Sequence, residues 1–79
     1  MHLEQADILV RLHREREAEQ LLSNALRDNP NDEVLRFSYA VLLSNGGKNS
    51  EAISEYSRII SRFPSNADAH FNRAKLLFL

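Results

Sequence analysis

The stretch EAISEYSRIISRFPSNADAHFN, residues 51–72, decides the fold of this chain. Its first part has apolar residues at the spacing of an amphipathic helix with one buried face: Ala52, Ile53, Tyr56, Ile59 and Ile60. Pro64 predicts the end of this helix, because proline lacks a backbone donor and disfavours helical geometry at Phe63. The next residues offer side-chain oxygens that can cap a second helix: Ser65, Asn66 and Asp68.

The same pattern occurs 34 residues earlier and, in part, 34 residues later. Small residues match small ones, large apolar residues match large ones, and proline matches proline. The matched sets are Ala6 with Ala40 and Ala74, Leu9 with Leu43 and Leu77, Ala18 with Ala52, Leu22 with Tyr56, Leu26 with Ile60, Pro30 with Pro64, and Phe37 with Phe71. A set this long, sorted by size, indicates an internal repeat.

The repeat predicts an all-α fold of five helices. We expect them at about 3–12, 15–27, 33–44, 51–62 and from 67 to the end of the chain. The first break falls at His13-Arg14 and contains no glycine. The second break is DNPNDE, with Asn31 or Asp32 as the cap, and the third is SNGGKNS, with Asn49 or Ser50 as the cap. The repeat boundaries follow at about 1–32, 33–66 and 67–79, within one domain.

Small residues stand where paired helices would cross. Helices approach to roughly 8–10 Å only when the side chains at the crossing allow it. Ala6 and Ala18 would meet in the first pair, and Ala40 and Ala52 in the second. A single pair cannot bury its apolar face alone, so successive pairs are expected to stack into a superhelix.

These features resemble the tetratricopeptide repeat family over essentially the whole chain. The matching motif residues are Ala6, Leu9, Ala18, Leu22, Ala25, Pro30, Ala40, Leu43, Gly47, Ala52, Tyr56, Pro64, Ala74 and Leu77. The chain departs from the family pattern at the early tryptophan position, held by His2, Arg36 and His70, at the turn residue His13 and at Ile59. The resemblance implies an α–α superhelix of antiparallel pairs, with two repeats and the first helix of a third.

The resemblance also implies a concave groove that holds an extended or helical peptide. Matching positions give its lining as Leu3, Asp7, Val10, Arg11, Val34, Phe37, Ser38, Val41, Asp68, Phe71, Asn72 and Lys75. Phe37 and Phe71 would be apolar anchors for a partner, or would simply pack between adjacent helices. One subfamily grips chaperone C-termini with cationic and amide side chains. Asp7 and Asp68 stand at such places here, so we expect no binding of such tails.

Composition narrows the function. The chain has 79 residues, a net charge of -1 and no cysteine, which argues against a nucleic-acid partner and against thiolate chemistry. The histidines, His2, His13 and His70, form no i, i+4 pair, so we predict no metal site and no cofactor. Because nothing places a nucleophile, a base and an oxyanion donor together, we predict no enzyme. No signal or membrane-spanning stretch is visible, which favours a cytoplasmic location.

The C-terminal sequence KLLFL predicts an exposed apolar patch of Leu76, Leu77 and Phe78. Two explanations stand: the chain is a piece of a longer array, or the patch forms a homodimer or meets a partner. Two functions stand as well. The first is a protein-interaction module that binds a peptide or helix. The alternative is a structural spacer or oligomerisation element with no peptide ligand of its own.

Overall fold

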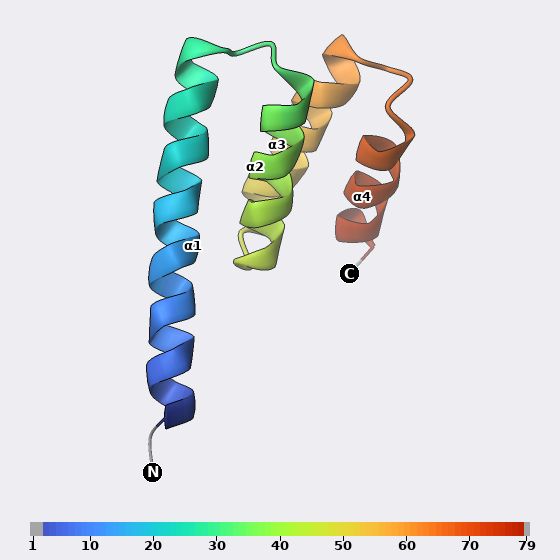
Figure 1. The fold of residues 1–79 in the computed structure, drawn as a ribbon. Coiled ribbons are helices and arrows are strands. Elements are labelled where there is room, and N and C mark those ends of the chain that lie inside the picture. The colour runs from blue at the N-terminus through green and yellow to red at the C-terminus, as the bar shows by residue number, and fades with distance from the viewer. Residues whose placement is uncertain (1–2, 79) are drawn as a thin grey trace.

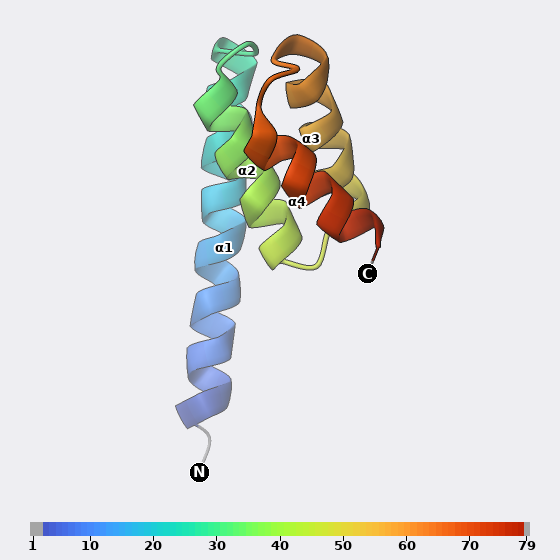
Figure 2. The same ribbon diagram turned by 90° about the vertical axis from the view of Figure 1, so that its right-hand side faces the viewer.

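The computed structural model describes the backbone of residues 3–78 and the side chains of residues 13–78. Over these residues the chain forms helices and no strands, which confirms the all-α fold class. The helices are α1 (Leu3–Asp28), α2 (Glu33–Asn45), α3 (Asn49–Arg62) and α4 (Ala67–Leu77). Each helix packs against the next one along the chain. Helix α3 lies behind α2 in Figure 1, and in the side view of Figure 2 α4 crosses in front of α2 and α3.

The predicted break at His13-Arg14 is wrong, because α1 runs through it as one helix of 26 residues. No glycine or proline interrupts this stretch, and His13 Nε2 lies 2.7 Å from Glu17 Oε1, one turn further on. The expected five helices are therefore four. The predicted crossing of Ala6 with Ala18 is wrong too, since twelve positions along one helix place them about 18 Å apart.

Two helices begin with the same cap, 34 residues apart. Asp32 Oδ1 accepts a hydrogen bond from the Leu35 N–H at 3.0 Å, and Asn66 Oδ1 accepts one from the Ala69 N–H at 2.9 Å. Each bond satisfies a helix N–H that has no partner within the helix. The repeat in the sequence is therefore also a repeat in the local structure, and Asp32 and Asn66 are the caps among the predicted alternatives.

The other two predicted boundaries have different outcomes. Helix α3 ends at Arg62, and Phe63 leaves the helical region with φ -126° and ψ 73°, as predicted from Pro64. The predicted cap at Asn49 or Ser50 is wrong. Helix α3 begins at Asn49, and the preceding residue, Lys48, makes no side-chain cap.

The core lies where α2, α3 and α4 meet. Its buried members are Ala40, Leu43, Ala52, Tyr56, Ile59 and Ala69. Ala40 and Ala52 are both fully buried, which confirms the predicted small-residue crossing of the second pair. One unit later, Ala74 is exposed and Leu77 is 57% exposed, so the same face of α4 lies open among the described residues.

Candidate functional site

A hollow of about 280 Å³ opens between the N-terminal ends of α2 and α4. It is lined by Glu33, Val34, Phe37, Ser38, Asn66 and Asp68. Four of these, Val34, Phe37, Ser38 and Asp68, belong to the groove expected from the sequence. Val34 is 74% exposed, so this open hollow presents an apolar side chain to solvent. Apolar contact area is therefore available to a partner there.

Asn66 joins the two walls of this hollow. Its Oδ1 caps α4, and its Nδ2 donates to Glu33 Oε2 at 2.9 Å across to α2. Glu33 lies in the first turn of α2 and Asp68 in the first turn of α4, so two carboxylates border the apolar floor. These charges favour a cationic group and disfavour a carboxylate at this end.

A second hollow, of about 120 Å³, lies towards the C-terminal ends of the same two helices. Its lining is Val41, Ser44, Asn45, Tyr56, Asn72, Lys75 and Leu76. Val41, Asn72 and Lys75 were expected in the groove. Asn72 Nδ2 donates to the Tyr56 hydroxyl at 3.3 Å. Burial raises the pKa of Tyr56, and the bond from Asn72 acts in the opposite direction.

The two expected aromatic anchors differ in their surroundings. Phe37 is half-buried, and its ring meets the ring of Tyr56 edge-on at 5.6 Å between centroids. Phe71 is 65% exposed and lines neither hollow, while Lys75 Nζ lies 5.5 Å from its ring centroid. Phe37 therefore serves packing as well as the hollow, whereas Phe71 is free to meet a partner.

The remaining expected site residues fall into two groups. The side chains of Leu3, Asp7, Val10 and Arg11 lie outside the described residues. At the other end of the chain, Leu77 and Phe78 are 57% and 87% exposed. The expected exposure of Leu76 is wrong, because this side chain is half-buried and packs against the core cluster.

The sequence did not single out Glu33, Ser44, Asn45 or Tyr56 as groove residues, and it treated Asn66 only as a cap. A signal was available for Asn66, because a cap places its own side chain at a helix mouth. None was available for Glu33, whose bond to Asn66 spans 33 positions.

A third hollow, of about 410 Å³, lies between α1 and α2. It is lined by Ala18, Leu22, Phe37, Ser38, Val41, Leu42 and Asn45. The sequence predicted that the first helix of the first unit would cover Ala18 and Leu22. The continuous α1 leaves both of them half-buried beside this opening.

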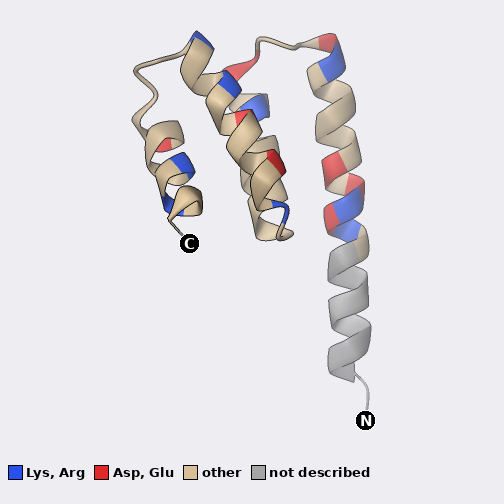
Figure 3. Cartoon of the chain, turned by 180° about the vertical axis from the view of Figure 1, so that it is seen from behind, with Lys and Arg blue, Asp and Glu red and all other residues tan. Residues whose placement is uncertain are grey.

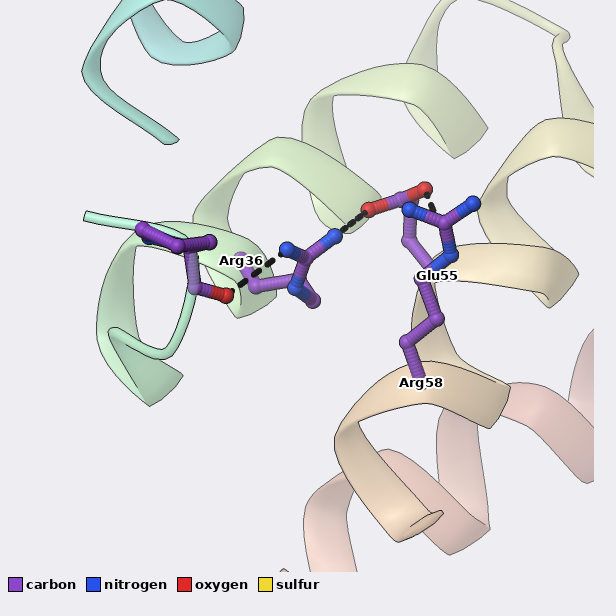
Figure 4. A network of polar contacts seen from close by, with 4 residues as sticks. Arg36, Glu55 and Arg58 are labelled. Carbon is purple, nitrogen blue, oxygen red and sulfur yellow. Dashed lines mark hydrogen bonds and ion pairs between the residues drawn. The ribbon is translucent and has the colours of Figure 1, made fainter. Parts of the chain in front are cut away.

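An ion-pair network joins α2 to α3 (Figure 4). Arg36 Nη1 donates to Glu55 Oε1 at 2.5 Å, and Arg58 Nε lies 3.9 Å from Glu55 Oε2. The side chains of Arg36 and Glu55 are only 15% and 12% exposed. Among the described residues, basic and acidic positions alternate in the stretch 14–17 of α1, whereas α3 has its two acids, Glu51 and Glu55, before its two arginines, Arg58 and Arg62 (Figure 3). The network holds α2, and so one wall of the first hollow, on α3.

Two further results concern only the described part of the chain. No three His, Asp or Glu side chains there form a group able to hold a metal ion. None of the helices there is both long and apolar enough to cross a bilayer.

Comparison with known proteins gives one match. A family model described as a tetratricopeptide repeat matches residues 9–76, which is most of the chain. The search of curated proteins found no match, and neither did the search of solved structures.

Proposed function

Because the chain belongs to the tetratricopeptide repeat family, whose members are generally protein-interaction modules, we propose that it binds a peptide segment of a partner protein in one groove. This α2–α4 groove consists of the two hollows that lie between α2 and α4. The role proposed is binding without catalysis.

The larger hollow of the groove is the observation that carries this proposal. An apolar floor at Val34 and Phe37 lies beside the carboxylates of Glu33 and Asp68. Apolar contact supplies affinity, while the charges select which residues can lie next to it.

The dimensions and charges of the groove suit a short segment. Its α2 wall has 13 residues, or about 18 Å of helix, which an extended peptide of five or six residues spans. We expect an apolar residue over Val34 and Phe37 and a basic residue beside Glu33 and Asp68. A peptide ending in EEVD should not bind at the acidic end, because its carboxylates meet like charges there.

Selection from a phage library of random decapeptides tests the proposal. A selected peptide is then synthesised and titrated into the chain by calorimetry. Val34→Glu should weaken binding at least tenfold, because it places a charge on the apolar floor. The matched control is Ser61→Glu, which adds the same charge at an exposed position of α3. Equal affinities for the two variants, or a selected set that shares no apolar and basic positions, would count against the groove.

A second candidate function is a structural or oligomerisation role. This role includes homodimerisation through α4. The exposure of Leu77 and Phe78 favours it, because apolar side chains this open commonly meet a partner. If the chain associates through this patch, replacing both residues by serine reduces self-association and leaves peptide binding unchanged. Val34→Glu should have the reverse pattern, so the pair of variants separates the two functions.

A further inference from the structure

The packing of α2 on α3 shows how one unit of this chain closes. Ala40 and Leu43 of α2 lie in the same buried cluster as Ala52 and Tyr56 of α3. All four are at most 1% exposed. The covering helix, α2, therefore has an alanine followed three positions later by a leucine. The helix that it covers, α3, has an alanine followed four positions later by a large residue.

One repeat unit earlier, part of α1 corresponds to the covered helix α3, but among the described residues no helix covers it as α2 covers α3. Ala18 and Leu22 of α1 correspond to Ala52 and Tyr56 through the 34-residue repeat. Both are only half-buried, and both line the hollow of about 410 Å³ between α1 and α2. Phe37 and Val41 line the same hollow and also pack against the core cluster. These two side chains therefore lie between the hollow and the core cluster.

The segment that would cover Ala18 and Leu22 is encoded in the same chain. Residues 3–12 contain Ala6 and Leu9, which correspond to Ala40 and Leu43 of α2. Yet these residues form the first part of α1, which continues straight through His13. Figure 1 shows this end of α1 running past the end of α2. A straight α1 therefore cannot fill its own hollow.

We propose that the hollow is filled by residues 3–12 of a second copy of the chain. Two straight α1 helices lie antiparallel in this dimer, with the two-fold axis near His13. Each α1 carries both the covering segment and one wall of the hollow. Each copy therefore fills the hollow of the other, and the two interfaces are identical. Closed, self-complementary contacts of this kind are the usual basis of two-fold dimers.

The dimer completes the groove. Leu3, Asp7, Val10 and Arg11 are the first row of the lining that the repeat predicts, and in the dimer the second copy supplies them beside Phe37, Ser38 and Val41. This consequence rests on the proposed function. The dimer does not, since it follows from the α2–α3 packing, the 34-residue repeat, the continuous α1 and the open hollow.

Sedimentation velocity of the full chain over a concentration series is the first test. We expect a dimer that Ala18→Glu converts to a monomer, because the charge falls inside the interface. Gln20→Glu adds the same charge to α1 at an exposed residue that lines a different, polar hollow, and it should leave the dimer intact. Replacing Leu77 and Phe78 by serine should also leave it intact. A wild-type chain that stays monomeric, or a dimer that survives Ala18→Glu and is lost with Leu77 and Phe78, overturns the proposal.

Cross-linking is the second test and does not depend on how well Ala18→Glu folds. The chain has no cysteine, so single cysteines can be placed freely. When Leu9→Cys and Ala18→Cys chains are mixed, a short bifunctional maleimide should join one chain of each kind. If the double variant instead cross-links within one chain, α1 folds back on itself and the proposal is wrong. Neither test involves a peptide, so a failed groove and a failed dimer give different results.

Discussion

Arg36 and His70, which stand 34 positions apart, make the same contact in successive units. Arg36 Nη2 donates to the Pro30 carbonyl oxygen at 2.8 Å, and His70 Nε2 lies 2.9 Å from the Pro64 carbonyl oxygen. Each side chain reaches back six residues and ties the loop to the helix that follows it. The contact repeats although the residue type does not, because an arginine and a histidine can both donate to a carbonyl.

The contact of Arg36 with Glu55 should contribute measurably to stability. We expect Glu55→Gln to lower the free energy of unfolding by about 1–3 kcal/mol, because it weakens a charged hydrogen bond to an arginine that is only 15% exposed. Guanidinium unfolding at neutral pH measures the change. Asp28→Asn, at an exposed position, is the control and should change stability by less than about 0.5 kcal/mol. Equal effects of the two substitutions would show that the network adds nothing.

Because Tyr56 is buried, we expect the free energy of unfolding to fall at alkaline pH. Burial raises its pKa, so the unfolded chain loses the phenolic proton at a lower pH than the folded chain does. The stability that neutral Tyr56 contributes is fully present below about pH 10, the ordinary pKa of tyrosine. It is lost as the pH rises through the raised pKa of the folded state. We expect Tyr56→Phe to flatten the decline in unfolding free energy above that pH.

The pKa of Lys48 is also raised, so its effect on alkaline stability must be separated from that of Tyr56. A hydrogen bond from its ammonium to Glu19 raises the pKa of Lys48, so this contact is also lost in the alkaline range. The pH series is therefore repeated in a Glu19→Gln background, which removes the pair. If Tyr56→Phe leaves the alkaline decline unchanged in that background, the decline does not come from Tyr56.

The two glycines between α2 and α3 should differ in their tolerance of a side chain. Gly47 has φ +81°, a region that L residues rarely adopt, whereas Gly46 has φ -85° and room for a Cβ at 3.6 Å from its neighbours. Gly47→Ala should cost about 1 kcal/mol, and Gly46→Ala should be close to neutral. Thermal unfolding of the two variants measures this. The reverse order would mean that the turn has another geometry in solution.

The parts of the fold that the sequence predicted correctly depend on local chemistry. Pro64 ends α3 and Asn66 caps α4 through groups only a few residues away. The break at His13 was different, because a helix pair there requires tertiary packing to outweigh an uninterrupted run of helix-compatible residues. In the structure the run continues, so α1 is one helix.

The lining of the larger hollow between α2 and α4 was predicted in part for a similar reason. Matching positions placed Val34, Phe37, Ser38 and Asp68 around one hollow, because they follow from the register of the repeat. The register also predicted equal roles for Phe37 and Phe71, and these differ. Phe37 has Tyr56 of the following helix to pack on, whereas Phe71 is mostly exposed.

The most direct test of the account compares Ala40→Leu with Ala74→Leu by guanidinium unfolding. The two alanines are equivalent through the repeat, but Ala40 is fully buried against α3 and Ala74 is exposed. If the repeat places α2 and α4 as described, Ala40→Leu lowers the free energy of unfolding by about 1–3 kcal/mol, because it overpacks the crossing. Ala74→Leu then changes it by less than about 0.5 kcal/mol. Equal losses, or a larger loss at Ala74, would contradict the account.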